Sequence, residues 1–231
     1  MDAAQKDASN PFGMDEACEN CGRCETRETV VHGYGDVGAD FLFVSASPSV
    51  EADARGEPVL DDGRLGRILR RIGFLAESPA GQSGSDAAPE SDAAPGSDAS
   101  PESDSGAGLA LENAYVTHLV RCHGPDAPTD GEVAACDPFL TAEIRMINPH
   151  VIVPIGGRTL EALAIEYTTS APGAFDVEQA HATTIRGRGF ELVPMLEPER
   201  QDDADAEAFV DYLRGNVLDR DYRQTKGRQE R

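Results

Sequence analysis

Four short apolar runs with helical patterns between them constrain the fold of this chain more than any other feature. The runs are rich in β-branched side chains and cover residues 40–47, 113–120, 150–156 and 190–196. Runs of this length and composition predict buried strands. Strands that alternate with helices in this way predict a three-layer α/β/α sandwich with a mainly parallel central sheet of about four strands.

Periodic apolar residues and capping signals mark the helices between these strands. One helical pattern ends at Gly73, a residue type that often terminates helices. Another starts at Thr129, three residues before Glu132 in a capping-box pattern, and must stop before Pro149. The predicted helices cover residues 65–72, 129–148, 157–167 and 203–217.

A six-residue repeat interrupts the α/β pattern. Ser85, Ser91, Ser97 and Ser103 stand in register within a segment rich in Ser, Asp, Ala, Pro and Gly. Such a segment cannot bury enough apolar surface to offset its chain entropy, so we expect a disordered insertion at about 77–108, with a solenoid as the alternative. The expected organisation is a disordered N-terminus (1–17), one domain (18–217) and a C-terminal tail (218–231).

The charge of the chain is strongly acidic. Asp and Glu number 42 against 20 Lys and Arg, which gives a net charge of -22, and the only lysines are Lys6 and Lys226. Spread evenly at low salt, this charge would repel nucleic acid and anionic membranes. The composition resembles that of proteins from salt-accumulating archaea, where molar salt screens such repulsion within about 3 Å. An ordinary acidic protein is the alternative.

Neither a membrane span nor a signal peptide is visible in the sequence. No apolar run approaches the ~20 residues that cross a bilayer, and the N-terminal residues lack the layout of a signal peptide. We therefore expect a cytoplasmic protein. In a reducing compartment, five cysteines favour metal ligands over disulfides.

Four of the cysteines form two widely separated groups. Cys18 and Cys21 make a CxxC pair, whereas Cys122 follows a predicted strand and Cys136 lies in the next predicted helix. Four thiolates that converge in a fold suit either Zn²⁺ or an iron-sulfur cluster, and the spacing does not separate the two. The alternative is that the cysteines pack as small hydrophobic residues. Cys24 is left over.

A resemblance to a known family rests on motifs distributed along the chain. The order "CENC", "FLFVSASPSVEADARGEPV", "YVTHLVRC", "EVAACDPFLTAEIRMINPHVIVPIG", "RG" and "VPMLEP" is similar to the family 4 uracil-DNA glycosylases, from about Cys18 to Val217. The resemblance implies a [4Fe-4S] cluster, with structural zinc as the alternative, and assigns its ligands as Cys18, Cys21, Cys122 and Cys136. It leaves Cys24 without a ligand role; we expect a core residue there, with a spare thiol near the cluster as the alternative.

The resemblance also implies an activity and a partner. Family members extrude a uracil nucleotide from DNA and hydrolyse its bond to the sugar at the carboxyl edge of the sheet, where ligands of α/β folds bind. The implied partner is DNA with a flipped or damaged base, and we expect the protein to act as a monomer away from membranes.

The motif positions that carry this chemistry are substituted. The family's GE(A/G)PG motif becomes "SASPS", so Ala46 replaces the acidic residue, and Val59 replaces a uracil-stacking Phe. His118 replaces the Asn that reads the base, and Glu197 replaces the His of the HPS motif. The catalytic positions are therefore occupied by Ala46, His118 and Glu197. The substrate pocket implied by the resemblance comprises Ser45, Ala46, Ser47, Pro48, Ser49, Val59, His118 and Glu197.

Elements that contact DNA in the family are better preserved. Arg186 and Gly187 match an RG element, and Pro198 keeps the proline of the final loop. Arginines along the first predicted helix could grip phosphates, or could lie on a solvated face and pair with acidic residues: Arg64, Arg67, Arg70 and Arg71.

Two functional hypotheses follow from these substitutions. The first is a DNA glycosylase with altered base preference, in which Glu197 and His118 could act as a new acid–base pair. The second is a non-catalytic nucleic-acid-binding or scaffold protein that retains the fold and the cluster.

Overall fold

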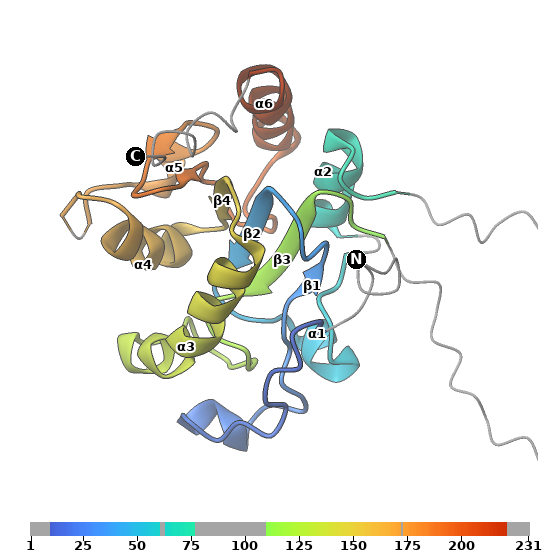
Figure 1. Cartoon of the computed structure of the whole chain (residues 1–231), viewed down its shortest axis with the longest axis vertical. Coiled ribbons are helices and arrows are strands. Elements are labelled where there is room, and N and C mark those ends of the chain that lie inside the picture. Colours follow the sequence, from blue (N-terminus) through green and yellow to red (C-terminus); the bar gives the residue numbers. More distant parts are fainter. Residues whose placement is uncertain (1–9, 61–62, 77–109, 172, 221–231) are drawn as a thin grey trace, which may run out of the picture.

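The protein folds as an α/β/α sandwich around a mixed sheet of six strands (Figure 1). The structure, a computed structural model, describes residues 10–60, 63–76, 110–171 and 173–220. The predicted insertion at 77–108, most of the expected disordered N-terminus and most of the C-terminal tail lie outside the described residues. The three-layer architecture predicted from the alternating pattern is confirmed.

The sheet has the strand order β1-β3-β2-β4-β6-β5. Its strands are β1 (Tyr34–Gly35), β2 (Phe41–Ser45), β3 (Ala114–His118), β4 (Val151–Pro154), β5 (Ile185–Arg186) and β6 (Glu191–Leu192). The four predicted strands form the parallel centre β3-β2-β4-β6. The expectation of about four strands is corrected by β1 and β5, which add antiparallel edges. Each is two residues long, too short to leave an alternating pattern in the sequence.

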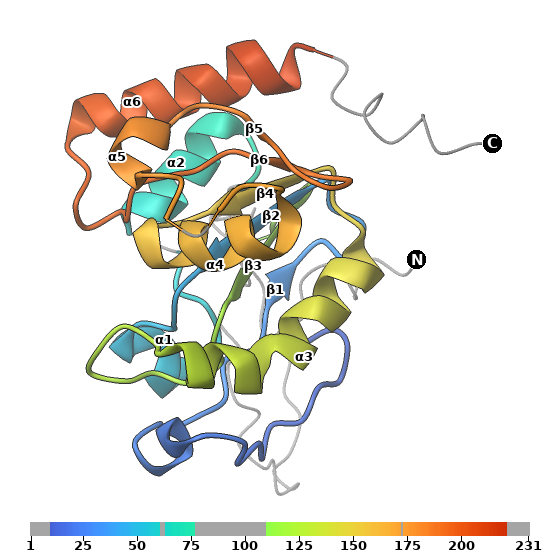
Figure 2. The same ribbon diagram turned by 90° about the vertical axis from the view of Figure 1, so that its left-hand side faces the viewer.

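Helices cover both faces of the sheet, as Figures 1 and 2 show from two directions. The α-helices are α1 (Val50–Arg55), α2 (Arg64–Ile72), α3 (Asp130–Ile147), α4 (Gly157–Tyr167), α5 (Val177–Ala180) and α6 (Asp203–Tyr212). A 3₁₀-helix, Gly22–Glu25, lies among the N-terminal cysteines, and a π-helix, Leu213–Leu218, continues α6.

Alternating side chains of the central strand separate the two halves of the core. Phe41 and Phe43 pack with residues of α2 and α6 on one face. Leu42 and Val44 pack with residues of α3 and α4 on the other. A strand buried on both faces has no polar side to show, which is why β2 appears in the sequence as a continuous apolar run.

The predicted helix ends are confirmed in the structure. Helix α2 terminates at Gly73, which adopts φ 96°, a left-handed conformation that glycine tolerates. Thr129 and Glu132 form the predicted capping box of α3, and Asn148 terminates that helix before Pro149. Helices α1 and α5 were not predicted because, at six and four residues, they are too short for a periodic pattern.

The parallel strands bring the segments that follow them to one edge of the sheet. Ser45 at the end of β2 pairs in register with His118 at the end of β3. Ile155, just after β4, forms a bridge with Met195, just after β6. This carboxyl edge is where the sequence predicts the site. In the described part of the chain, no helix combines the length and the apolarity needed to span a membrane.

Candidate functional site

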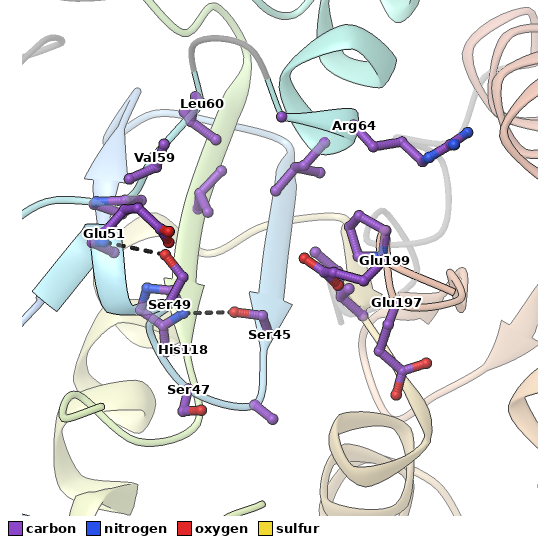
Figure 3. A pocket seen from close by; sticks show the side chains of 18 of the residues that line it. Ser45, Ser47, Ser49, Glu51, Val59, Leu60, Arg64, His118, Glu197 and Glu199 are labelled. Carbon is purple, nitrogen blue, oxygen red and sulfur yellow. Dashed lines mark hydrogen bonds between the residues drawn. The ribbon is translucent and has the colours of Figure 1, made fainter. Parts of the chain in front are cut away.

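A cavity of about 450 Å³ lies at the carboxyl edge of the sheet (Figure 3). All but one of the predicted pocket residues line it: Ser45, Ala46, Ser47, Ser49, Val59, His118 and Glu197. The exception is Pro48, which is buried and offers its carbonyl oxygen to His123 Nδ1 at 3.0 Å. Pro198 also lines the cavity. The tertiary structure therefore gathers substituted motif positions from four segments around one space.

Several lining residues had no assigned role in the sequence. Apolar walls come from Leu60, Leu65, Val116 and Ile155, and carboxylates come from Glu51 and Glu199. The walls are ordinary apolar residues of the core, so nothing in the sequence distinguishes them. Glu51 could have been suspected, because it lies two residues after the "SASPS" motif.

His118 is the buried polar side chain of this cavity. It is only 5% exposed, and its Nδ1 lies 2.6 Å from the hydroxyl oxygen of Ser45. Its other ring nitrogen, Nε2, has no hydrogen-bond partner among the residues that the structure describes. Burial, with a smaller contribution from the Arg121 charge, lowers the pKa of His118 from 6.5 to about 3. The imidazole is therefore neutral at physiological pH.

This lowered pKa predicts acid sensitivity of the fold. The unfolded chain binds a proton on His118 below about pH 6.5, whereas the folded protein does not until about pH 3, so stability falls as pH drops between these values. We expect wild type to lose on the order of 2 kcal/mol more than His118→Gln between pH 7.5 and 4.5. Urea unfolding of both proteins at the two pH values measures the difference, and equal losses would contradict a buried neutral His118.

Two of the three serines of "SASPS" use their hydroxyl groups within the protein. Ser45 bonds His118, and the Ser49 side chain accepts a hydrogen bond from the Ala52 backbone N–H at 3.1 Å, which caps α1. Hydrogen bonds from its own backbone N–H and from Ser49 hold the pKa of Glu51 below its usual range. The cavity mouth therefore carries an ionised carboxylate at Glu51.

Glu197 is held by the first turn of α4. Its Oε1 accepts a hydrogen bond from the Gly157 backbone N–H at 3.3 Å, and Arg200 lies 3.7 Å from its Oε2. Gly156, the N-cap residue of α4, has no side chain to cap the helix, and a Cβ there would collide with Glu197. A carboxylate at a helix N-terminus satisfies a free N–H and complements the helix dipole. Glu197 thus caps α4.

The suggested Glu197–His118 pair does not form. Strands β2 and β4 lie between β3, which carries His118, and β6, which precedes Glu197. The Glu197 carboxylate also turns away from His118 in Figure 3. The hypothesis of an acid–base pair between these two residues is therefore not supported by the strand order.

A buried ion pair joins the segment that follows β3 to helix α3. Arg121 Nη2 contacts Glu143 Oε2 at 2.6 Å, and each side chain is 1% exposed. Thr117 donates to the same oxygen at 2.6 Å and also accepts a hydrogen bond from Arg121. Tyr115 and the Gly33 backbone N–H bond the other Glu143 oxygen. The network connects α3 to the end of β3. Its one signal in the sequence is Glu143, a charged residue on the otherwise apolar face of α3.

Four cysteines gather at one end of the fold. Cys18 and Cys122 pack in a small buried cluster with Val30. Burial, with smaller contributions from Cys136 and Cys21 and against the lowering effect of Arg27, raises the pKa of Cys122 to about 11. Burial also raises the pKa of Cys136, with Cys21 and Cys18 among its charged neighbours. The two cysteine groups, about a hundred residues apart in sequence, are therefore neighbours in space.

All five cysteines are free thiols. Arg27 Nη1 lies 3.6 Å from Cys122 Sγ and can neutralise charge there. Cys24 lies in the 3₁₀-helix and is only partly buried, which disagrees with the expectation of a core residue. Within the described ranges, no group of three or more His, Cys, Asp or Glu side chains is arranged to hold a metal ion.

The residues proposed to contact DNA do not gather in one place. Pro198 lines the cavity. Arg186 belongs to β5 and stands opposite Glu191, the first residue of β6, in the strand register, at the other end of the sheet. Gly187 follows in the same hairpin, where a Cβ would approach the carbonyl oxygens of Phe190 and Tyr167 to 2.9 Å. Tight packing is thus a sufficient reason for this glycine.

The arginines of α2 pair partly with acidic residues. Arg64 contacts Asp203 at 3.0 Å, and Arg71 contacts Glu207 at 2.7 Å. Both partners belong to α6, so these two ion pairs connect the helices of one layer. For Arg64 and Arg71, the structure agrees with the alternative of a solvated face that pairs with acidic residues.

Comparison with known proteins agrees with the fold. The family model of the uracil DNA glycosylase superfamily matches residues 32–201, more than half of the 231 residues. The chain belongs to this superfamily, and the resemblance seen in its motifs is confirmed. The matched segment contains the cavity residues, Cys122 and Cys136, but begins after Cys18 and Cys21.

Similar curated proteins point to one branch of the superfamily. Type-4 uracil-DNA glycosylases from Thermotoga maritima and Archaeoglobus fulgidus are 27% and 24% identical to this chain. The alignments cover 80% and 76% of this chain, and 79% and 69% of these relatives. The type-4 enzyme of Saccharolobus solfataricus is 26% identical to this chain. That alignment covers 60% of this chain but only half the length of the relative.

Proposed function

We propose that this protein binds DNA, takes a flipped base into the cavity at the carboxyl edge of the sheet, and hydrolyses the bond between that base and its sugar. The observation that carries the proposal is the buried His118, whose Nε2 has no partner among the described residues and which lines the cavity. The names of the relatives, type-4 uracil-DNA glycosylases, support the reaction class.

The cavity suits an extruded base. Its walls are apolar, with Val59, Val116 and Ile155 available to contact the faces of a ring. A few polar groups at one end can read the base edge, as in most small-molecule sites. The cost of flipping, a few kcal/mol, is lower for a mismatched or damaged base, which favours such substrates.

The chemistry requires stabilisation of a departing base anion and orientation of a water molecule. His118 supplies a neutral imidazole whose Nε2 can donate a hydrogen bond to developing charge. Ala46 cannot position water, so we assign that role to Glu51, the ionised carboxylate at the cavity mouth. Glu197 takes no direct part in this scheme, because it caps α4.

Thiolates are the ligands that soft metal centres prefer. We propose that Cys18, Cys21, Cys122 and Cys136 hold a [4Fe-4S] cluster, with structural Zn²⁺ as the alternative. A bound cation would stabilise thiolates that burial otherwise disfavours. The role we assign to the centre is structural, because it would tie the N-terminal segment to the end of β3 and to α3.

A second function, a non-catalytic DNA-binding or scaffold protein, is favoured by one specific observation. Glu197 occupies the position of the family's final-motif His, yet its carboxylate is committed to the N-terminus of α4. Together with Ala46, this leaves two positions of the family's reaction without their usual groups. In this alternative the cavity binds a base but releases nothing.

Base release is the experiment that separates the two functions. We expect anaerobically purified protein, in molar salt to match its acidic surface, to release a base from oligonucleotides carrying uracil, hypoxanthine or a mismatch. Alkaline cleavage of the resulting abasic site gives the readout. His118→Ala should lower the release rate by about tenfold or more, whereas His150→Gln, at the opposite edge of the sheet, should leave it unchanged.

The outcomes of this assay point in opposite directions. Release of any base removes the scaffold alternative. Retention of every base, with the DNA still bound, removes the glycosylase and supports the scaffold.

A further inference from the structure

The guanidinium of Arg27 contacts a sulfur atom. Its Nη1 lies 3.6 Å from Cys122 Sγ, although the two residues are 95 positions apart in the sequence. The chain carries 42 Asp and Glu against 20 Lys and Arg, so an arginine has many carboxylates to pair with. Arg23 pairs with Glu132 at 2.9 Å, yet within the described ranges Arg27 forms no ion pair with a carboxylate. The side-chain partner of Arg27 is a cysteine.

The short segment that carries Arg27 is anchored to the start of α3. The Arg27 backbone N–H donates a hydrogen bond to the Arg23 carbonyl oxygen at 3.1 Å. The Arg23 side chain is 6% exposed, pairs with Glu132 in the first turn of α3, and donates to the Asp126 carbonyl oxygen at 2.8 Å. Because Arg23 fixes the 3₁₀-helix, Arg27 reaches Cys122 from a backbone that is itself held in place.

This contact fits a cysteine that bears a negative charge. Cys122 is 3% exposed, and burying an anion costs free energy unless a positive charge or a hydrogen bond compensates it. A neutral thiol in the core needs no such partner, because it packs as a small hydrophobic group. Arginine stays charged in proteins, so the half-buried Arg27 offers a permanent countercharge. The arrangement is therefore that of a thiolate with its hydrogen-bond donor.

The proposed metal centre would have a charge that suits this donor. Four thiolates outweigh the charge of Zn²⁺ or of an oxidised [4Fe-4S] cluster, so the filled site keeps a net negative charge. One-electron reduction of a cluster adds a further negative charge. A positive donor beside a sulfur ligand therefore stabilises the reduced form more than the oxidised form, and hydrogen bonds to the sulfurs are among the factors that set the potential.

We propose that Arg27 is a positioning residue of this centre. Its hydrogen bond to Cys122 Sγ orients that ligand, slows the loss of the metal and raises the reduction potential of a [4Fe-4S] cluster. The inference rests on the proposed metal centre and is independent of the base that the cavity takes.

Substitutions at Arg27 test the effect on the reduction potential. Arg27→Met removes the charge and the donor but keeps a long side chain, whereas Arg27→Lys keeps the charge without the planar guanidinium. Spectroelectrochemical titration, in which an electrode supplies the electron, gives the midpoint potential of each anaerobically purified protein. We expect Arg27→Met to lower the potential by about 60 mV, a tenfold change in a one-electron equilibrium, and Arg27→Lys to lower it less.

Loss of the metal is a second readout, and it applies to iron and to zinc. An excess of a colorimetric chelator removes the metal, and absorbance follows the rate of release. We expect Arg27→Met to release its metal about tenfold faster than wild type, because groups that orient metal ligands contribute about this much to affinity. Arg71→Met is the matched control. Arg71 pairs with Glu207 at the surface, so this variant should match wild type in both readouts.

The outcomes separate failure of the inference from failure of the proposed centre. A wild-type protein that holds neither iron nor zinc removes the centre, and the inference with it. A metal centre whose potential and release rate are the same in wild type and Arg27→Met overturns the inference alone. For a zinc centre the release rate decides. If Arg27→Met does not fold, Arg27→Gln removes the charge with a smaller change, and wild-type values in that variant overturn the inference.

Discussion

Cys122→Ser should abolish the visible absorbance of the anaerobically purified protein and destabilise its fold on the order of 5 kcal/mol. Cys122 is 3% exposed and lies between the N-terminal cysteines and α3, so losing its thiolate would open the proposed [4Fe-4S] site. Absorbance spectra, iron and sulfide content, and urea unfolding measure the effect.

Cys24→Ser is the control that the chain itself offers. Cys24 lies three residues from Cys21 in the same short segment, but it is only partly buried and has no assigned ligand role. We expect its variant to keep full colour and nearly wild-type stability. A colourless wild type with stoichiometric zinc would overturn the iron-sulfur assignment, and an unchanged Cys122→Ser variant would contradict a metal centre of either kind.

Glu143→Gln should cost about 3–5 kcal/mol of unfolding free energy. The substitution keeps the size of the side chain but leaves the Arg121 charge buried without its counter-ion. It also weakens the acceptor that Thr117, Tyr115 and Gly33 share. Urea unfolding at pH 7.5 measures the loss.

Glu207→Gln makes the same chemical change at the surface. Glu207 pairs with Arg71 at 2.7 Å, but the two side chains are 59% and 43% exposed. Water and salt screen such a pair, so we expect a change below about 1 kcal/mol. Equal effects of the two variants would show that the Arg121–Glu143 network does not stabilise the fold.

Much of the fold could be predicted because its signals are local. The four central strands appear as apolar runs, and α3 carries its capping box within four consecutive residues. Strands β1 and β5 escaped prediction because two residues carry no periodicity. Their pairing depends on the neighbouring strands, which are distant in sequence.

The candidate site could be predicted in position but not in detail. Parallel strands bring their carboxyl ends together, so the sequence indicated that "SASPS", His118 and "LEPE" would meet. It did not indicate that Glu197 would turn to the first turn of α4, or that Arg186 would lie at the far edge. Side-chain direction depends on partners that only the packed structure supplies.

The sequence by itself determined the α/β/α class, the order of its main elements, the superfamily and the motif positions that differ from its relatives, because these are written in local patterns. The tertiary structure decided which groups meet. Ser45 reaches His118 across 73 residues, Gly157 reaches Glu197 across 40, and Arg121 reaches Glu143 across 22. Hydrogen bonds act over about 3 Å, and no local pattern encodes a contact between residues so far apart along the chain.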